Sequence, residues 1–396
     1  MRPQVLLIFL TTYEESLEML RGIAHHGRSH RPWQTFLDDE ARSVSEPSWL
    51  LSKHWDGIIS RHTTPEIVRV CAEKKIPLVD VSDCAVFPGV PKIRPDNLAI
   101  GHMGAEHFLE KGYREFAFAG FSNEEWSSTR RDGFAEAVAL GGGTNRVFDV
   151  EYPGQLTPDW DEEQITLLAQ WIADLPKPLG LMACNDMRAL QVIAATQMLN
   201  MMVPEMVAVV GANNETIRCE LSSPPLSSVA TNAFQSGYRA ADTLAMVLDG
   251  GAVPHVDVRI DPVGVIARHS TDALAIEDKN VVAALSYIRE NACRGLTVTE
   301  VLHHAVATRS QLEKKFRRYL GRSPQAEIRR VQIAKIRQLL GETEFPLKKI
   351  AELTGFDHVE YMCYLFKRTM GVAPGAFRKK AQVAPKNTSR RRSLDA

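Results

Sequence analysis

The last third of the chain contains the same two-helix pattern twice. Three pairs of identical residues are each 50 positions apart: Phe316 and Phe366, Gly321 and Gly371, and Pro324 and Pro374. Matches that recur at one fixed interval indicate an internal repeat. Part of this chain must therefore fold as two copies of one small helical unit.

The first copy reads as two short helices joined by a tight turn. Glu300 follows Thr297 by three residues, and Gln311 follows Thr308 in the same way, which is the capping-box pattern that begins a helix. Apolar residues then recur at helical spacing. Two short helices this close together match the helix-turn-helix unit, whose second helix enters the major groove of DNA.

The second copy repeats this arrangement. Its first helix begins at Leu347, a turn follows at Gly355, and we expect the second helix to restart at Asp357, three residues before Glu360. Between the copies, residues 324–340 read as one connecting helix with a proline in its first turn. One rigid helix would hold the two units at a fixed separation.

The net charge of the chain changes sign shortly before this repeated segment. Residues 277–396 contain 24 Lys+Arg and 12 Asp+Glu, a net charge of +12, whereas residues 1–276 contain 23 and 36, a net charge of −13. A basic helical segment beside an acidic remainder is typical of a DNA-binding domain attached to a second domain that does not contact the DNA phosphates.

Residues 280–380 resemble the AraC/XylS-type transcriptional regulators. The resemblance includes both units, the connecting helix and the closing segment 371–378, and it implies two recognition helices in successive major-groove segments. Val306 stands where this family usually has glycine, and a β-branched residue tolerates a positive φ poorly, so this turn is expected to differ. Met362 replaces the usual Phe.

The residues expected to contact DNA are those that the apolar positions leave outward on the two recognition helices. They are Arg309, Ser310, Gln311, Lys314 and Arg317 in the first helix and His358, Tyr361, Lys367 and Arg368 in the second. Arginine can pair with guanine and glutamine with adenine, whereas Lys and the later Arg side chains fit phosphates. For each residue taken alone, a solvated surface position remains the alternative.

The first two-thirds of the chain alternates short apolar runs with helical stretches. The runs are 5–10, 57–59, 77–81, 116–120, 179–183 and 207–211, and the helical stretches include 100–111, 130–140, 164–175 and 186–199. This alternation predicts an α/β fold with doubly wound parallel sheets. Ligands of such folds bind beyond the carboxyl ends of the strands.

Polar residues at these strand ends resemble the effector-binding core of LacI/GalR-type repressors, which has the two-lobed fold of periplasmic sugar-binding proteins. The resemblance covers residues 4–270 and implies that Arg130, Asn185 and Asn213 bind sugar hydroxyls, with Asp186 beside them. Such side chains can donate and accept hydrogen bonds together. Asn213 departs from the Asp that is usual in this family.

Each of these residues also has a structural interpretation. Asp186 can cap its helix, Asn213 can lie in a turn, and Arg130 can pair with a surface carboxylate. Tyr13 follows the first strand and can stack on a sugar face, while the next two residues, both Glu, are typical of a helix start. Large aromatic residues such as Trp126 belong either to the core or to the cleft.

A sensor followed by a C-terminal AraC-type domain resembles the xylose operon regulators over the whole chain. That resemblance implies a cytoplasmic, homodimeric activator that binds double-stranded DNA, responds to D-xylose and contacts RNA polymerase. The segment 10–16 departs from that family. A different sugar or a non-sugar ligand is therefore the alternative effector.

Other classes of protein fit less well. The N-terminal apolar run is too short for a signal peptide, which argues against a secreted solute-binding protein, and no run approaches a membrane span. We find no sequence motif of an enzyme, a metal site or a cofactor site. Six cysteines without CxxC spacing are typical of reduced thiols.

The expected organisation is a two-lobed sensor over residues 1–270 and a linker over 271–279. An all-α DNA-binding domain with two helix-turn-helix units follows over 280–380. A disordered basic tail is expected over 381–396.

Overall fold

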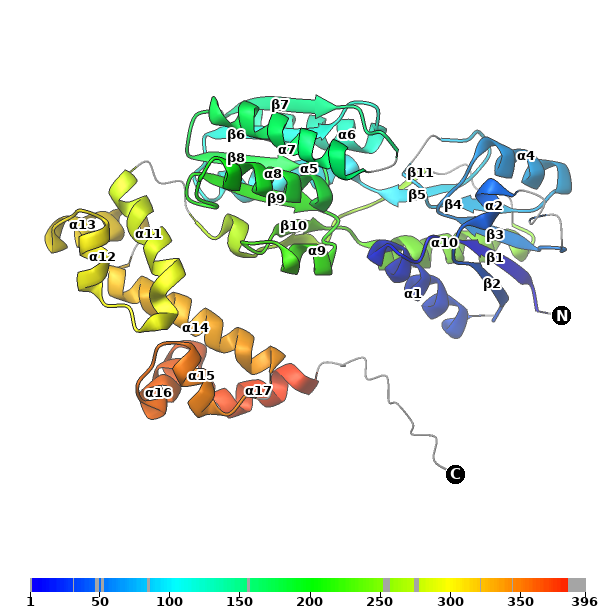
Figure 1. Ribbon diagram of the computed structural model, residues 1–396. Coiled ribbons are helices and arrows are strands. Elements are labelled where there is room, and N and C mark those ends of the chain that lie inside the picture. Colours follow the sequence, from blue (N-terminus) through cyan, green and yellow to red (C-terminus); the bar gives the residue numbers. More distant parts are fainter. Residues whose placement is uncertain are drawn as a thin grey trace. The chain divides into compact units, whose positions relative to one another are not determined.

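The computed structural model describes residues 2–30, 32–46, 50, 53–83, 86–154, 157–251, 257–273, 278–320, 322–343 and 345–383. The chain divides into two compact units, residues 1–275 and 276–396, which are described separately. The first unit has the expected α/β fold with two mainly parallel sheets, and the second is helical, so the predicted fold class is confirmed (Figure 1). Among the described residues, no helix is long and apolar enough to cross a membrane.

The first lobe of the sensor is built on a six-stranded sheet in the order β11-β5-β4-β3-β1-β2. Its strands are β1 (Gln4–Ile8), β2 (Gln34–Asp38), β3 (Gly57–Ser60), β4 (Leu78–Asp80), β5 (Lys92–Pro95) and β11 (Asp257–Ile260). Its helices are α1 (Glu14–Ser29), α2 (Arg42–Ser45), α4 (Pro65–Lys74) and α10 (Ala233–Leu248). All strand pairs are parallel, as the buried apolar runs predict.

The second lobe repeats this plan with the strand order β12-β10-β9-β8-β6-β7. Its strands are β6 (Glu115–Phe121), β7 (Thr144–Val150), β8 (Leu179–Ala183), β9 (Val207–Ala212), β10 (Ser227–Ala230) and β12 (Gly264–Ile266), the last antiparallel to β10. Its helices are α5 (Asn97–Leu109), α6 (Glu125–Leu140), α7 (Pro158–Ala173), α8 (Asp186–Met198) and α9 (Thr216–Leu221).

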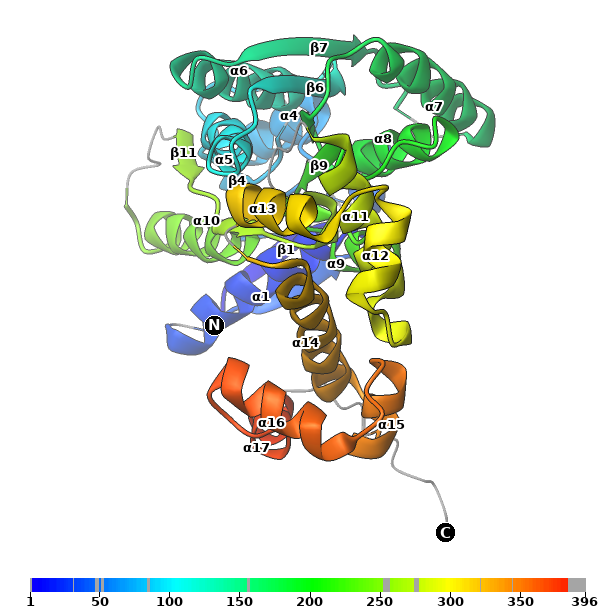
Figure 2. The same cartoon turned by 90° about the vertical axis from the view of Figure 1, so that its left-hand side faces the viewer.

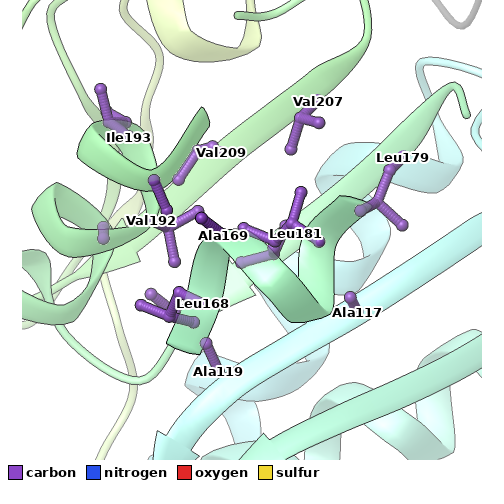
Figure 3. Close-up of a cluster of buried hydrophobic side chains, with 14 of the residues drawn as sticks. Ala117, Ala119, Leu168, Ala169, Leu179, Leu181, Val192, Ile193, Val207 and Val209 are labelled. Carbon is purple, nitrogen blue, oxygen red and sulfur yellow. The ribbon is translucent and has the colours of Figure 1, made fainter. Parts of the chain in front are cut away.

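The core of the second lobe fixes its strand ends in place. Leu181 and Val209 of neighbouring strands pack against Leu168 of α7 and Val192 of α8, all fully buried (Figure 3). On the other side of this sheet, α5 and α6 lie unusually close, because a Cβ at Gly101 would be 2.0 Å from the carbonyl oxygen of Arg130. Only glycine permits this approach, which sets the position of Arg130.

The second unit consists of seven α-helices in its described part. They are α11 (Lys279–Asn291), α12 (Val298–His304), α13 (Arg309–Leu320), α14 (Pro324–Glu342), α15 (Leu347–Leu353), α16 (Val359–Met370) and α17 (Pro374–Val383), with the short 3-10 helix η2 (Ala292–Arg294) after α11. Figure 2 shows α14 running from the α12–α13 pair to the α15–α16 pair. The two helix-turn-helix units and their connecting helix are thus present as expected.

Several expected boundaries differ from the structure. Helix α16 begins at Val359 rather than Asp357, and its N-cap residue, His358, makes no side-chain capping bond. Ser270 and Thr271 are fully buried in the second lobe, so the expected linker is shorter at its start. Its middle, residues 274–277, lies outside the described residues. Helix α17 continues to Val383, and the rest of the expected tail also lies outside them.

Candidate functional site

A cavity of about 240 Å³ lies between the two lobes of the sensor. Its walls are the segments that follow the carboxyl ends of strands in both lobes, as expected for doubly wound sheets. The lining residues are Tyr13, Glu14, Glu15, Arg61, Asp83, Phe121, Glu124, Trp126, Arg130, Tyr152, Asn185, Met187, Asn213 and Glu215. The cavity is smaller than the ~300–1,000 Å³ typical of drug-sized ligands, which suits a small metabolite.

Arg130 forms part of the cavity floor and is only 1% exposed. Its Nε donates to the side-chain oxygen of Asn97 at 2.9 Å, its Nη1 donates to the carbonyl oxygen of Cys184 at 2.7 Å, and its guanidinium lies 5.1 Å from the ring centroid of Trp126. Among the described residues it forms no ion pair, so the surface-carboxylate interpretation does not hold. Nη2 has no hydrogen bond within that part of the chain and is available to a ligand.

Asn185 and Asp186 have different roles. The side-chain oxygen of Asn185 accepts from the backbone N–H of Arg188 at 2.8 Å, so Asn185 caps α8 and keeps its amide group for the cavity that it lines. Asp186 is fully buried behind the cavity and is not a lining residue. The helix cap is thus Asn185, not Asp186.

Asp186 instead anchors the loop between β9 and α9. One carboxylate oxygen accepts from the Ser228 hydroxyl at 2.5 Å, and the other accepts from the backbone N–H of Glu215 at 2.6 Å. Burial raises the pKa of Asp186 to about 7 despite these two donors. Asp186 therefore positions the loop that carries Asn213 and Glu215.

Asn213 lies in this loop with a positive φ of 97°, and Asn214 follows with 54°. Such values favour a turn, and asparagine tolerates them better than most residues. The side-chain oxygen of Asn213 is buried and has no hydrogen-bond partner among the described residues. Asn213 therefore lies in a turn and also presents an unpaired acceptor at the cavity.

Tyr13 and the two following glutamates come from the first lobe. Tyr13 is 48% exposed, and the Arg61 guanidinium lies 5.7 Å from its ring centroid. Glu15 pairs with Arg61 and accepts from the Thr231 hydroxyl at 2.9 Å. Glu14 accepts from the backbone N–H of Thr216 in the second lobe at 2.5 Å. Both glutamates thus have specific partners beyond the start of their own helix.

The cavity brings together four of the five residues expected from the sequence and adds others that sequence reasoning missed. Arg61, Asp83, Phe121, Glu124 and Tyr152 each follow or end a strand. For all but Tyr152, which follows the partly exposed strand β7, position after a buried run was the only signal in the sequence. Among the described residues, no group of His, Cys, Asp and Glu is arranged to hold a metal ion.

The candidate DNA-contact surface lies on α13 and α16 of the second unit. All nine residues expected there are exposed. Two of them have partners within α13: Arg309 pairs with Glu313 at 3.2 Å, and the side-chain oxygen of Gln311 accepts from the backbone N–H of Thr308 at 3.3 Å. Gln311 thus serves the helix cap in the free protein.

The buried side chain of Gln332 links η2, which precedes the first helix-turn-helix unit, to the turn of the second unit. The amide nitrogen of Gln332 on α14 donates to the carbonyl oxygens of Ala292 and Thr354, both at 2.9 Å. Gly355 in the second turn has φ 72°, and a Cβ there would be 2.5 Å from the backbone nitrogen of Gly295. These contacts fix the relative position of the units around α14, which is about 28 Å long at ~1.5 Å per residue.

Known proteins share this arrangement. Residues 105–271 match the periplasmic binding protein-like domain family, and residues 302–380 match a helix-turn-helix domain family. The xylose operon regulatory protein of Haemophilus influenzae is 31% identical, covering 95% of this chain and 98% of the relative, and that of Escherichia coli K12 is 31% identical, covering 95% and 97%.

A solved structure agrees with these relatives. The structure of the xylose-binding transcription activator XylR matches with a TM-score of 0.79 and 29% identity, covering 96% of this chain and 98% of that one. The similarity in sequence and structure extends over both units. This chain therefore belongs to the family of the xylose operon regulatory proteins, DNA-binding transcriptional regulators that respond to a sugar.

Proposed function

We propose that this protein is a D-xylose-responsive activator of sugar-utilisation genes. The relatives named above are regulators of xylose operons, and the match extends over nearly the whole chain. The observation that carries the proposal is the convergence of Arg130, Asn185 and Asn213 on one small cavity. They supply a free guanidinium nitrogen, a free amide group and an unpaired carbonyl oxygen, which suit adjacent hydroxyls that both donate and accept.

The mechanism that we propose is a shift between lobe arrangements. A sugar in the cavity contacts both lobes and therefore stabilises the closed arrangement to the extent that it binds that state more tightly. In a cytoplasmic homodimer, this change reorients two DNA-binding units toward paired half-sites and allows contact with RNA polymerase.

The two recognition helices contribute unequally to DNA binding in this proposal. Helix α13 carries five Lys and Arg residues and one Glu, whereas α16 carries two and one. We assign most phosphate contacts to α13, with Arg309, Ser310 and Gln311 near its start reading bases and Lys314 and Arg317 holding phosphates. On α16, His358 and Tyr361 would contact bases, and Lys367 and Arg368 phosphates.

The experiment is calorimetric titration of the full-length protein with D-xylose, arabinose, ribose, glucose and galactose. We expect saturable binding of D-xylose and at least tenfold weaker binding in Asn185→Asp, which keeps the capping oxygen but removes the amide donor. The same substitution at Asn280, outside the sensor, is the control. Binding of another sugar in place of D-xylose would change the proposed effector but not the assignment of the protein as a transcriptional regulator.

A further inference from the structure

Acidic side chains outnumber basic ones in the cavity. Five lining residues are carboxylic acids, namely Glu14, Glu15, Asp83, Glu124 and Glu215, and only Arg61 and Arg130 are bases. A small cavity with this composition has a negative potential, because low-dielectric walls screen its charges poorly.

Cations within the protein compensate this charge only in part. Glu15 pairs with Arg61, and Glu215 pairs with Arg218 at 2.6 Å. In the described part of the chain, Glu14 and Glu124 form no ion pair. Glu14 accepts from a backbone N–H, and Glu124 accepts from the Trp126 indole at 2.8 Å. Two carboxylates therefore face the cavity without a counter-charge.

Asp83 is a further partly buried acid at the cavity. Its carboxylate is near Arg130 and Arg61, and the Asn97 amide lies 3.5 Å away. Burial and the charge of Glu15 nevertheless raise the pKa of Asp83 above its usual value. The two guanidinium groups lower the pKa of Asp83 but do not offset the effects of burial and of Glu15.

The aromatic residues of the cavity also favour a neutral or positively charged ligand. Tyr13, Phe121, Trp126 and Tyr152 line the cavity, and guanidinium groups of the protein lie over the rings of the first three. Ring faces attract cations and also stack on the apolar faces of sugars. Carboxylates beside aromatic rings are therefore suited to a polyol that is neutral or positively charged.

We propose that this cavity selects its effector by charge, accepting a neutral sugar or a sugar-sized molecule with a protonated amine and rejecting one with a carboxylate or phosphate. Glu14 on the first lobe and Glu124 on the second determine this selection. The proposal rests on the proposed sugar-sensing function of the same cavity. It adds that closure of the lobes brings two unneutralised acids to the ligand from opposite sides.

Two series of neutral, amino and acidic compounds test the proposal by calorimetry on the full-length protein, with xylitol as the neutral open-chain control for D-xylonate. The first is D-xylose, its piperidine iminosugar analogue and D-xylonate, and the second is D-glucose, D-glucosamine and D-glucuronate. We expect the iminosugar to bind at least as tightly as D-xylose and D-xylonate to bind at least about tenfold more weakly. D-xylonate binding as tightly as D-xylose would overturn the charge selection while leaving the D-xylose proposal intact.

Substitutions test whether Glu14 and Glu124 are the residues that determine the selection by charge. Replacing both, Glu14→Gln with Glu124→Gln, should narrow the difference in affinity between the iminosugar and D-xylonate about tenfold, because glutamine keeps the size and the accepting oxygen but removes the charge. Glu18→Gln, on the exposed side of α1, should leave the gap unchanged. An unchanged gap in the double variant would overturn the assignment.

The second series separates the two proposals. If D-xylose does not bind but D-glucosamine binds more tightly than D-glucuronate, the charge selection stands and the D-xylose assignment fails. If no compound of either series binds, both fail.

Discussion

The Glu14 carboxylate, in the first lobe, accepts a hydrogen bond of 2.5 Å from the backbone N–H of Thr216, in the second. Thr216 is the first residue of α9, so the bond joins the start of α1 to the start of α9. This bond holds the lobes together beside the cavity. A ligand that bridges the lobes would therefore add to the Glu14–Thr216 hydrogen bond, which already links them.

Removing this contact should expose the Thr216 amide to solvent. We expect Glu14→Leu to speed hydrogen exchange at Thr216 about tenfold, because a hydrogen bond to a charged group contributes ~1.5–3 kcal/mol. Exchange mass spectrometry of the segment 213–221 measures this change. Glu18→Leu on the same helix is the control, and unchanged exchange in Glu14→Leu would show that the bond does not hold the lobes.

The stability of the sensor should depend on pH through Asp186. Its folded-state pKa, about 7, is above the ordinary 3.8, so it favours folding below pH ~4, and this contribution is lost as pH rises through 7. The free energy of unfolding should fall by about 2–3 kcal/mol between pH 5 and 8, at ~1.4 kcal/mol per pKa unit.

Tryptophan fluorescence during urea unfolding can measure this slope in the full-length protein. All six tryptophans lie within residues 1–275, so the signal reports the sensor alone. Asp186→Asn cannot titrate and should flatten the slope. A slope that persists in Asp186→Asn would assign the dependence to another group.

Val306 and Gly355 occupy the turns of the two helix-turn-helix units, with φ of 48° and 72°. A left-handed conformation costs a residue with a Cβ ~1–2 kcal/mol, and Val306 is 85% exposed, so its side chain gains little from packing. Val306→Gly should stabilise the second unit by about 0.5–1 kcal/mol after the entropic cost of glycine. Thermal unfolding followed by far-UV circular dichroism measures this, and Val306→Ala should gain less.

Gln332 should contribute strongly to the stability of the DNA-binding unit. Gln332→Leu leaves two buried carbonyl oxygens without this donor, which should cost about 2–6 kcal/mol at ~1–3 kcal/mol each. The exposed Gln325 on the same helix is the matched control, and far-UV circular dichroism follows both variants. Equal stability of Gln332→Leu and Gln325→Leu would mean that other contacts suffice to join the units.

DNA affinity should respond differently to Arg309 and Lys367. Arg309→Ala should reduce discrimination between specific and random duplex by about 1–3 kcal/mol, whereas Lys367→Ala should weaken both alike and lower the salt slope by about 1. Binding titrations at several salt concentrations, with an operator selected from a random library, measure both quantities. Equal losses on both duplexes for Arg309→Ala would exclude base reading by this residue.

Sequence patterns predicted six of the twelve strands that the structure describes in the first unit, and both helix-turn-helix units of the second, because those patterns are local. The Thr297–Glu300 capping box is present in the structure, and the buried runs became parallel strands. The start of α16 was misplaced, because Asp357 and Glu360 fit a capping pattern that the chain does not use. Spacing shows which residues can cap a helix, whereas backbone geometry decides which one does.

The sequence by itself therefore determined the fold class, the order of the two units and their opposite charges. Only the tertiary structure shows that Glu14, Asp83 and Glu124 line one cavity and that Asp186 is buried outside its lining. These residues lie on separate strand ends in two lobes, and no periodicity along the chain relates them. Their meeting follows from strand order and close helix packing, which are long-range properties that arise only when the chain folds.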